Sequence, residues 1–140
     1  MGLAEKISLL FAGLFLLVGM LTGVWKYVKI MRSIERLAPP YVDIAHRNAL
    51  MFSFAAVVIA TLVKYSPFSS GWQVVMIAVP FFFFVMTSIG QITEGIKDRT
   101  DNIFKTHDPV RNMFMYALVA GEIGSIAVLV GGFIYTQFFI

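Results

Sequence analysis

Four long apolar stretches constrain this chain more than any other feature of its sequence. They cover residues 7–24, 45–63, 72–90 and 113–138. Each has the length, roughly 17–25 residues, that a helix needs to cross a bilayer. Lipid offers the backbone no hydrogen-bonding partner, so only helices or a closed barrel can span it. The stretches are continuously apolar rather than alternating, and they therefore predict helices.

The composition agrees with a membrane location. Of the 140 residues, 59% are hydrophobic, above the roughly 45–50% apolar content of soluble domains. The sequence therefore predicts an all-α, polytopic integral membrane protein in which residues 1–140 form one four-helix transmembrane bundle. There is no cysteine, which excludes disulfides and thiolate metal sites.

Basic residues lie mostly on one side of the predicted spans. The first and third connections hold or adjoin Lys26, Lys29, Arg32, Arg36, Arg47, Lys97, Arg99, Lys105 and Arg111, whereas only Lys6 and Lys64 lie on the other side. The positive-inside rule then predicts cytoplasmic long connections and non-cytoplasmic termini, in what we expect to be a bacterial inner membrane. The net charge of +3 reflects orientation and contact with anionic lipid, so no nucleic-acid partner is expected.

The two long connections carry helix signals of their own. The first helix is expected to continue beyond the membrane until Pro39 and Pro40 end it. The third connection, "TEGIKDRTDNIFKTHDP", has apolar residues at loose helical spacing, which predicts a short interfacial helix.

Acidic residues precede the second and fourth spans. Asp108 followed by Pro109 is the preferred pairing of an N-cap acceptor with proline at the first helical position, and Asp43 is expected to cap the second helix similarly. Arg47 and Arg111 follow closely, and we expect them to contact lipid phosphates or these aspartates.

Small and aromatic residues suggest how the spans pack. Gly19 and Gly23 have the spacing that lets helix backbones approach closely, within one molecule or between copies. In the third span Pro80 predicts a kink, and Phe81–Phe84 follow it. The four rings are expected mainly to face lipid, with an apolar substrate cavity as the alternative.

Glu122 is the only acidic side chain deep inside a predicted span. Intramembrane carboxylates are costly and commonly functional, so Glu122 is a candidate for binding a proton or cation in transport. The structural alternative is a protonated carboxyl that hydrogen-bonds Thr22, Thr61 or Ser125.

His46 and His107 are the only histidines. Without cysteines or helical ligand spacing they make a poor zinc or copper site. His107 lies in a polar connection and is expected to be solvated. His46 begins the second span among apolar residues, where one imidazole nitrogen suffices as the axial ligand of a haem iron; the alternative is an interfacial histidine without a ligand.

The glycine-rich "LLFAGLFLLVGMLTG", the Ala45–His46 pair, the short outer turn and four spans within 140 residues resemble the small membrane isomerases, styrene oxide isomerase and hydroxylaminobenzene mutase. The resemblance implies that His46 binds haem b between the subunits of a homotrimer. It also implies that ferric iron acts as a Lewis acid on a small apolar epoxide or hydroxylamine-type substrate. Phe52 stands where that family has an asparagine, and the third span has no tyrosine.

A second resemblance is to the membrane-associated glutathione and eicosanoid enzymes. Ala45 and Asn48 match the Ala-x-x-Asn pattern of their second helix, but Met51 stands in place of the following glutamate. Two further alternatives are a small oligomeric transporter or channel that uses Glu122, and an accessory subunit of a larger membrane complex.

Overall fold

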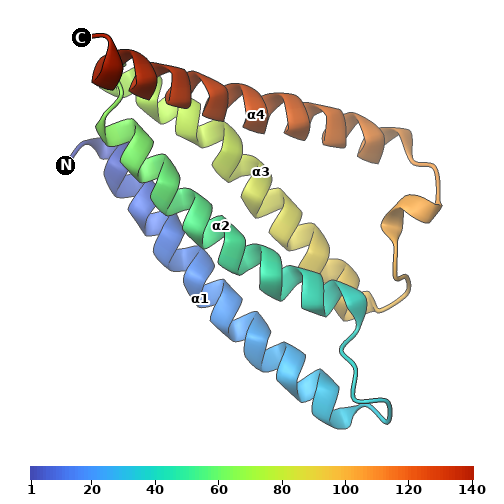
Figure 1. Cartoon of the computed structure of the whole chain (residues 1–140). Helices are drawn as coiled ribbons and strands as arrows, with labels where there is room; N and C mark the ends of the chain where they lie inside the picture. The colour runs from blue at the N-terminus through green and yellow to red at the C-terminus, as the bar shows by residue number, and fades with distance from the viewer.

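Four long helices make up nearly the whole chain (Figure 1), and the computed structural model describes all residues, 1–140. They are α1 (Leu3–Arg32), α2 (Pro40–Lys64), α3 (Ser70–Lys97) and α4 (Pro109–Phe138), with the short 3-10 helix η1 (Ile103–Lys105) before α4. All four α-helices are long and apolar enough to cross a membrane. The predicted all-α fold with four candidate spans is confirmed, and an integral membrane location is supported.

Successive helices run in opposite directions along the bundle. Both termini lie at one end, and the α1–α2 and α3–α4 connections lie at the other (Figure 1). A chain with an even number of antiparallel spans must bring its termini together in this way. Which side of the membrane that end faces stays a prediction.

The first connection differs from its prediction at both ends. α1 ends at Arg32, before Pro39, because Ser33 adopts an extended conformation while its N–H donates to the carbonyls of Lys29 and Ile30. α2 begins at Pro40, with Pro39 in the N-cap position. Pro40, at the first helical position, has no N–H to satisfy and has a φ suited to a helix. The helix therefore starts before Asp43, and the prediction that Asp43 caps it is wrong. Asp43 lies within the first turn instead.

The third connection has its predicted cap and a short helix. The Asp108 carboxylate accepts hydrogen bonds from the backbone N–H groups of Val110 (3.0 Å) and Arg111 (3.3 Å), which confirms it as the N-cap of α4. Only the three residues of η1 are helical in the rest of the connection, and they form a 3-10 turn.

Phenylalanine rings fill the core between α1, α2 and α3. Phe11 stacks on Phe81 with ring centroids 4.5 Å apart, and Phe52 stacks on Phe84 at 4.3 Å. In the run after Pro80 only Phe82 is exposed, at 56%, while the other three rings are at most 9% exposed. The expectation that these rings mainly face lipid is therefore wrong, because three of them complete the protein core.

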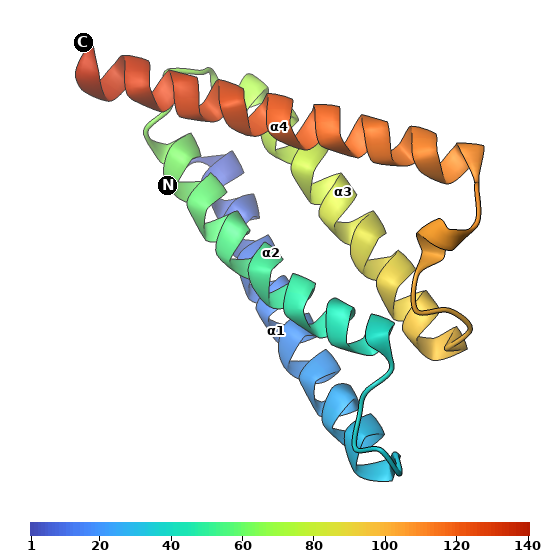
Figure 2. The same cartoon turned by 45° about the vertical axis from the view of Figure 1, so that its right-hand side comes forward.

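α4 is the least buried of the four helices, with only Leu129 and Gly132 fully covered. It makes contacts with α2 and α3 but none with α1. Figures 1 and 2 show that α4 meets the bundle near its C-terminal end and diverges from α3 toward η1. Residues of α3, η1 and α4, with Tyr41 and Ile44 of α2, line a cleft at this end of the molecule.

Candidate functional site

The His46 ring lies in the interface between α1 and α2. Its Nδ1 atom is 2.8 Å from the carbonyl oxygen of Gly19. A Cβ atom built on Gly23 would lie only 2.9 Å from the ring carbon Cε1. The two glycines, four residues apart on α1, therefore form a notch into which the imidazole fits. Close packing at this glycine pair is confirmed, and it occurs within one molecule.

The hydrogen bond to Gly19 fixes the chemistry of the ring. A carbonyl oxygen can only accept, so Nδ1 carries the hydrogen and donates it. In the neutral imidazole the lone pair is then on Nε2, the other nitrogen that histidine uses to bind metals. Metal-bound histidines commonly have this backbone hydrogen bond. The protein groups around His46 therefore fit the role of an axial ligand.

The surroundings of His46 limit where a large cofactor could sit. No group of three or more His, Asp or Glu side chains that could hold a metal ion is present, so iron would depend on His46 and a porphyrin. His46 is half-buried, and it lines neither the cavity at Arg111 nor the one at Glu122.

Charged groups cluster one turn before His46. Asp43 lies 2.5 Å from the Lys26 ammonium of α1 and 2.9 Å from the Arg47 guanidinium. The predicted contact of Arg47 with an aspartate is thus confirmed, although its side chain remains 64% exposed. Asn48, the residue after Arg47 on α2, is half-buried. This cluster fastens the start of α2 to α1 beside the imidazole.

Glu122 lies in a separate groove of about 660 Å³ between α2, α3 and α4. It is the only charged residue among ten that line the groove. Two of its predicted partners are engaged elsewhere: the Thr22 hydroxyl donates to Val18 and the Thr61 hydroxyl donates to Val57, each within its own helix. The structure thus gives Glu122 an apolar setting and neither threonine as a partner.

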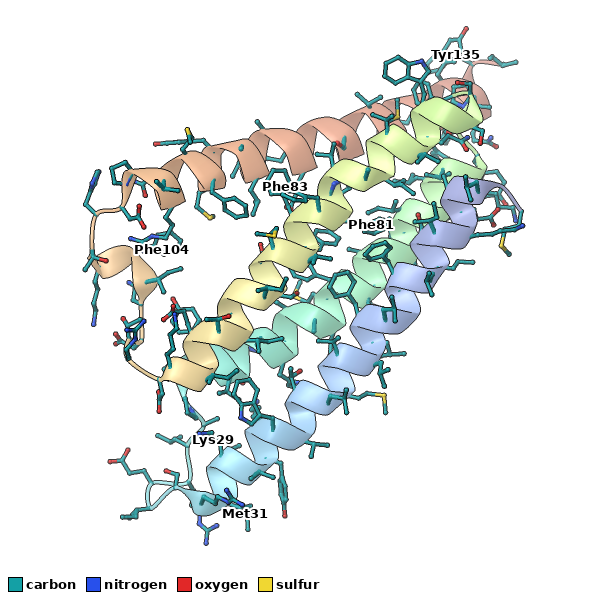
Figure 3. All side chains as sticks on the ribbon, turned by 180° about the vertical axis from the view of Figure 1, so that it is seen from behind. Lys29, Met31, Phe81, Phe83, Phe104 and Tyr135 are labelled. Carbon is teal, nitrogen blue, oxygen red and sulfur yellow. The ribbon has the colours of Figure 1, made fainter.

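Arg111 lies in the cleft between α3 and α4, which has a volume of about 480 Å³. Its Nη2 atom donates to the carbonyl of Thr106, and its guanidinium lies over the Phe104 ring, 5.6 Å from the centroid. The predicted contact with Asp108 is weak, since their closest charged atoms are 4.0 Å apart. Figure 3 shows Phe104 of η1 below the start of α4, and Phe83 of α3 facing α4.

The lining of this cleft also includes polar residues that the sequence reasoning missed. Tyr41 of α2 is buried at 7% exposure, and Gln91 and Glu94 come from α3. Thr87, Gln91 and Glu94 recur at intervals of four and three residues, which places them on one helix face. That spacing near the end of a span was the signal that could have revealed the cleft.

The sequence-predicted residues do not form one site. His46 faces α1, Arg111 and Glu122 belong to α4, and α4 does not contact α1. His107 is exposed, as predicted. Comparison of the chain with known protein families, with curated proteins and with solved structures finds no match.

Proposed function

We propose that this protein is a haem b-binding membrane isomerase that acts, as a homo-oligomer and most simply a trimer, on a small apolar epoxide or hydroxylamine-type substrate. The observation that carries the proposal is the contact between His46 and the glycine pair of α1. The glycine-rich first helix and the Ala–His pair are the two features behind the isomerase resemblance. They are far apart in the sequence, yet Nδ1 of His46 lies 2.8 Å from the Gly19 carbonyl.

Each residue of this contact has a defined role in the proposal. The Gly19 carbonyl holds the imidazole in one tautomer, Gly23 leaves room for the ring, and His46 Nε2 binds the iron. When bound, ferric haem supplies a Lewis acid that polarises the oxygen of the substrate. The isomerase resemblance implies a haem between subunits, and the cofactor is therefore proposed to lie between subunits here.

The core beside this site presents apolar surface where the isomerases have an asparagine. Phe52, at the position of the isomerase asparagine, stacks on Phe84 at 4.3 Å. Phe81 and Phe84 both belong to the buried core, and Phe84 also lines the Glu122 groove. Substrate selection in the proposed enzyme therefore depends on apolar shape rather than on a hydrogen bond at Phe52.

The test is an absorption spectrum of the detergent-purified protein from haem-supplemented cells, before and after dithionite. We expect a Soret band that shifts on reduction and that His46→Ala removes. His107→Ala is the matched control, since it deletes the only other histidine from an exposed position. A wild-type protein without a Soret band, or a His46→Ala variant with stoichiometric haem, would overturn the proposal.

A variant of Gly23 separates the positioning of the His46 ring from its proposed ligation of iron. In Gly23→Ala the added methyl group would meet the imidazole at 2.9 Å, so the ring must move. We expect weaker haem retention and a displaced Soret maximum, with the fold preserved. Gly13→Ala is the control, because nothing lies within 4 Å of a Cβ at Gly13.

A second candidate function is transport coupled to protonation of Glu122. The observation in its favour is the single carboxyl in an apolar groove of about 660 Å³. In proteoliposomes, Glu122→Gln should abolish pH-dependent flux while the protein still inserts and folds. Unchanged flux in this variant would remove Glu122 from any transport mechanism.

A further inference from the structure

The cleft between α3 and α4 combines an apolar wall with a polar end. Its apolar wall includes Met86, Phe114, Met115 and Leu118, and its polar end includes Tyr41, Gln91, Glu94 and Arg111. A volume of about 480 Å³ is within the range of about 300–1,000 Å³ found for small-molecule sites. The cleft lies next to α4, away from the His46 notch on α1.

Buried polar atoms without partners concentrate in this lining. Three side-chain atoms in the chain are buried and make no hydrogen bond, and two of them, Gln91 Oε1 and Arg111 Nε, belong to residues of the cleft. Most buried polar atoms in proteins are satisfied, so such atoms call for a missing partner. The unpaired donor and acceptor, both covered by their neighbours, show that the polar end of this cleft is short of hydrogen-bond partners within the protein.

The charge at this end is centred on Arg111. Its side chain is only 21% exposed, and the nearest carboxylate oxygen, of Asp108, is 4.0 Å away. Glu94 is the other charged residue of the lining, and it has Lys97 at 3.9 Å. Arginine has five N–H donors in a planar fork that suits carboxylate and phosphate. One of them is used by the neutral carbonyl of Thr106, so most of the fork remains available.

Tyr41 adds a further donor. Its hydroxyl oxygen accepts a hydrogen bond from the backbone N–H of Ile103 at 2.9 Å, which ties η1 to α2 and leaves the hydroxyl hydrogen free. Arg111 precedes the apolar stretch 113–138 by two residues, and such a residue lies near the lipid headgroups. The polar end of the cleft is thus at headgroup depth, and its apolar wall continues into the span.

We propose that the α3–α4 cleft binds an anionic amphiphile from the membrane, with its carboxylate or phosphate head on Arg111 and its acyl chain against Met86, Phe114 and Leu118. The bound head accepts hydrogen bonds from the guanidinium and from Tyr41. Binding places an anionic group beside the Arg111 guanidinium, whose nearest carboxylate oxygen in the protein is 4.0 Å away.

The test uses the full-length protein in nanodiscs of zwitterionic phosphatidylcholine, with a fluorescent fatty acid as the probe. Oleate and phosphatidylglycerol are added separately as competitors. Competition by oleate identifies a free fatty acid as a source of the head, and competition by phosphatidylglycerol identifies a membrane phospholipid; either result supports the site. Methyl oleate has the same chain without the charge, and equal competition by methyl oleate and oleate would overturn the anionic-head assignment.

Two variants localise the binding. Arg111→Gln should weaken probe binding by about tenfold, since charge-assisted hydrogen bonds are lost; Arg47→Gln, which removes an exposed arginine outside the cleft, should not. Gly90→Leu should block the cleft, because Gly90 lines it and nothing lies within 4 Å of an added Cβ. Gly13→Leu is the matched control, with equally open surroundings. Undiminished binding by both Arg111→Gln and Gly90→Leu would show that the cleft is not the site.

Discussion

At the scale of single residues, the packing of α1 against α2 depends on Gly19. An added Cβ there would lie 2.5 Å from Leu50 Cδ2 and 3.3 Å from the Leu50 backbone nitrogen. The side-chain atom can move, but the backbone nitrogen cannot move without separating α1 from α2. The same glycine also provides the carbonyl that orients His46.

We therefore expect Gly19→Val to destabilise the protein by about 1–3 kcal/mol, the usual cost of overpacking. Thermal unfolding in detergent, followed by circular dichroism, measures this. Gly13→Val is the control, since it introduces the same side chain into open surroundings. Equal stability of the two variants would contradict the close packing at Gly19.

Glu122 presents the opposite case, in which the native residue is unfavourable for stability. The groove around it is otherwise formed by uncharged residues from three helices, and an unpaired polar group in apolar surroundings costs roughly 1–3 kcal/mol. Glu122→Leu should therefore unfold at an equal or higher temperature than the wild type. A marked loss of stability in this variant would mean that the carboxyl has a structural partner.

At the scale of helices, α4 begins with a side-chain cap that the other three α-helices lack. The Asp108 carboxylate accepts two backbone N–H groups, and loss of such a cap typically costs about 1 kcal/mol. Asp108→Ala should lower stability by this amount, while Asp108→Asn should keep most of it because the amide oxygen can still accept. If alanine and asparagine were equally destabilising, charge and not capping would be the contribution of Asp108.

Asp43 contributes to α2 in a different way. It joins Lys26 and Arg47 across the start of α2 without capping it. Partly exposed ion pairs contribute about 0.2–1 kcal/mol and are screened by salt. Asp43→Asn should therefore lose stability at low salt, with the difference from the wild type shrinking as NaCl is added. A salt-independent difference would assign Asp43 a role other than ion pairing.

At the scale of the whole molecule, the arrangement of the ends predicts a labelling pattern. The chain has no cysteine, so single cysteines can be introduced without background. In Ser69→Cys the thiol lies between α2 and α3, and in Thr100→Cys it lies in the connection at the opposite end. By the positive-inside rule, a membrane-impermeant maleimide applied to intact cells should label Ser69→Cys and leave Thr100→Cys unlabelled. The reverse pattern would invert the predicted orientation.

The exposed fourth helix bears on the proposed oligomer. Only two residues of α4 are buried within the chain, and the haem at His46 is proposed to lie between subunits. Native mass spectrometry of the haem-loaded protein should therefore detect an oligomer, most simply a trimer, that falls apart when His46→Ala removes the cofactor. A haem-bound monomer would contradict the intersubunit location.

The sequence by itself determined the number of helices, their apolar spans and the cap at Asp108. These features depend on hydrophobic length and on a short-range hydrogen bond, both of which are encoded locally. It also singled out His46 and Glu122, because polar groups among apolar residues are conspicuous. The predicted ends of the first connection were wrong, since the choice between Pro39 and Asp43 as the start of α2 depends on how the chain turns from α1.

Only the tertiary structure decided what those residues touch. Gly19 and Gly23 of α1 precede His46 of α2 by at most 27 residues. Their contact nevertheless depends on the antiparallel packing of the two helices. The burial of Phe81 depends on its packing against α1, where Phe11 stacks on it. The cleft at Arg111 depends on how α4 meets α3 and then diverges from it. A side chain's direction around its own helix follows from its sequence position, whereas the surface that it meets is set by the other helices.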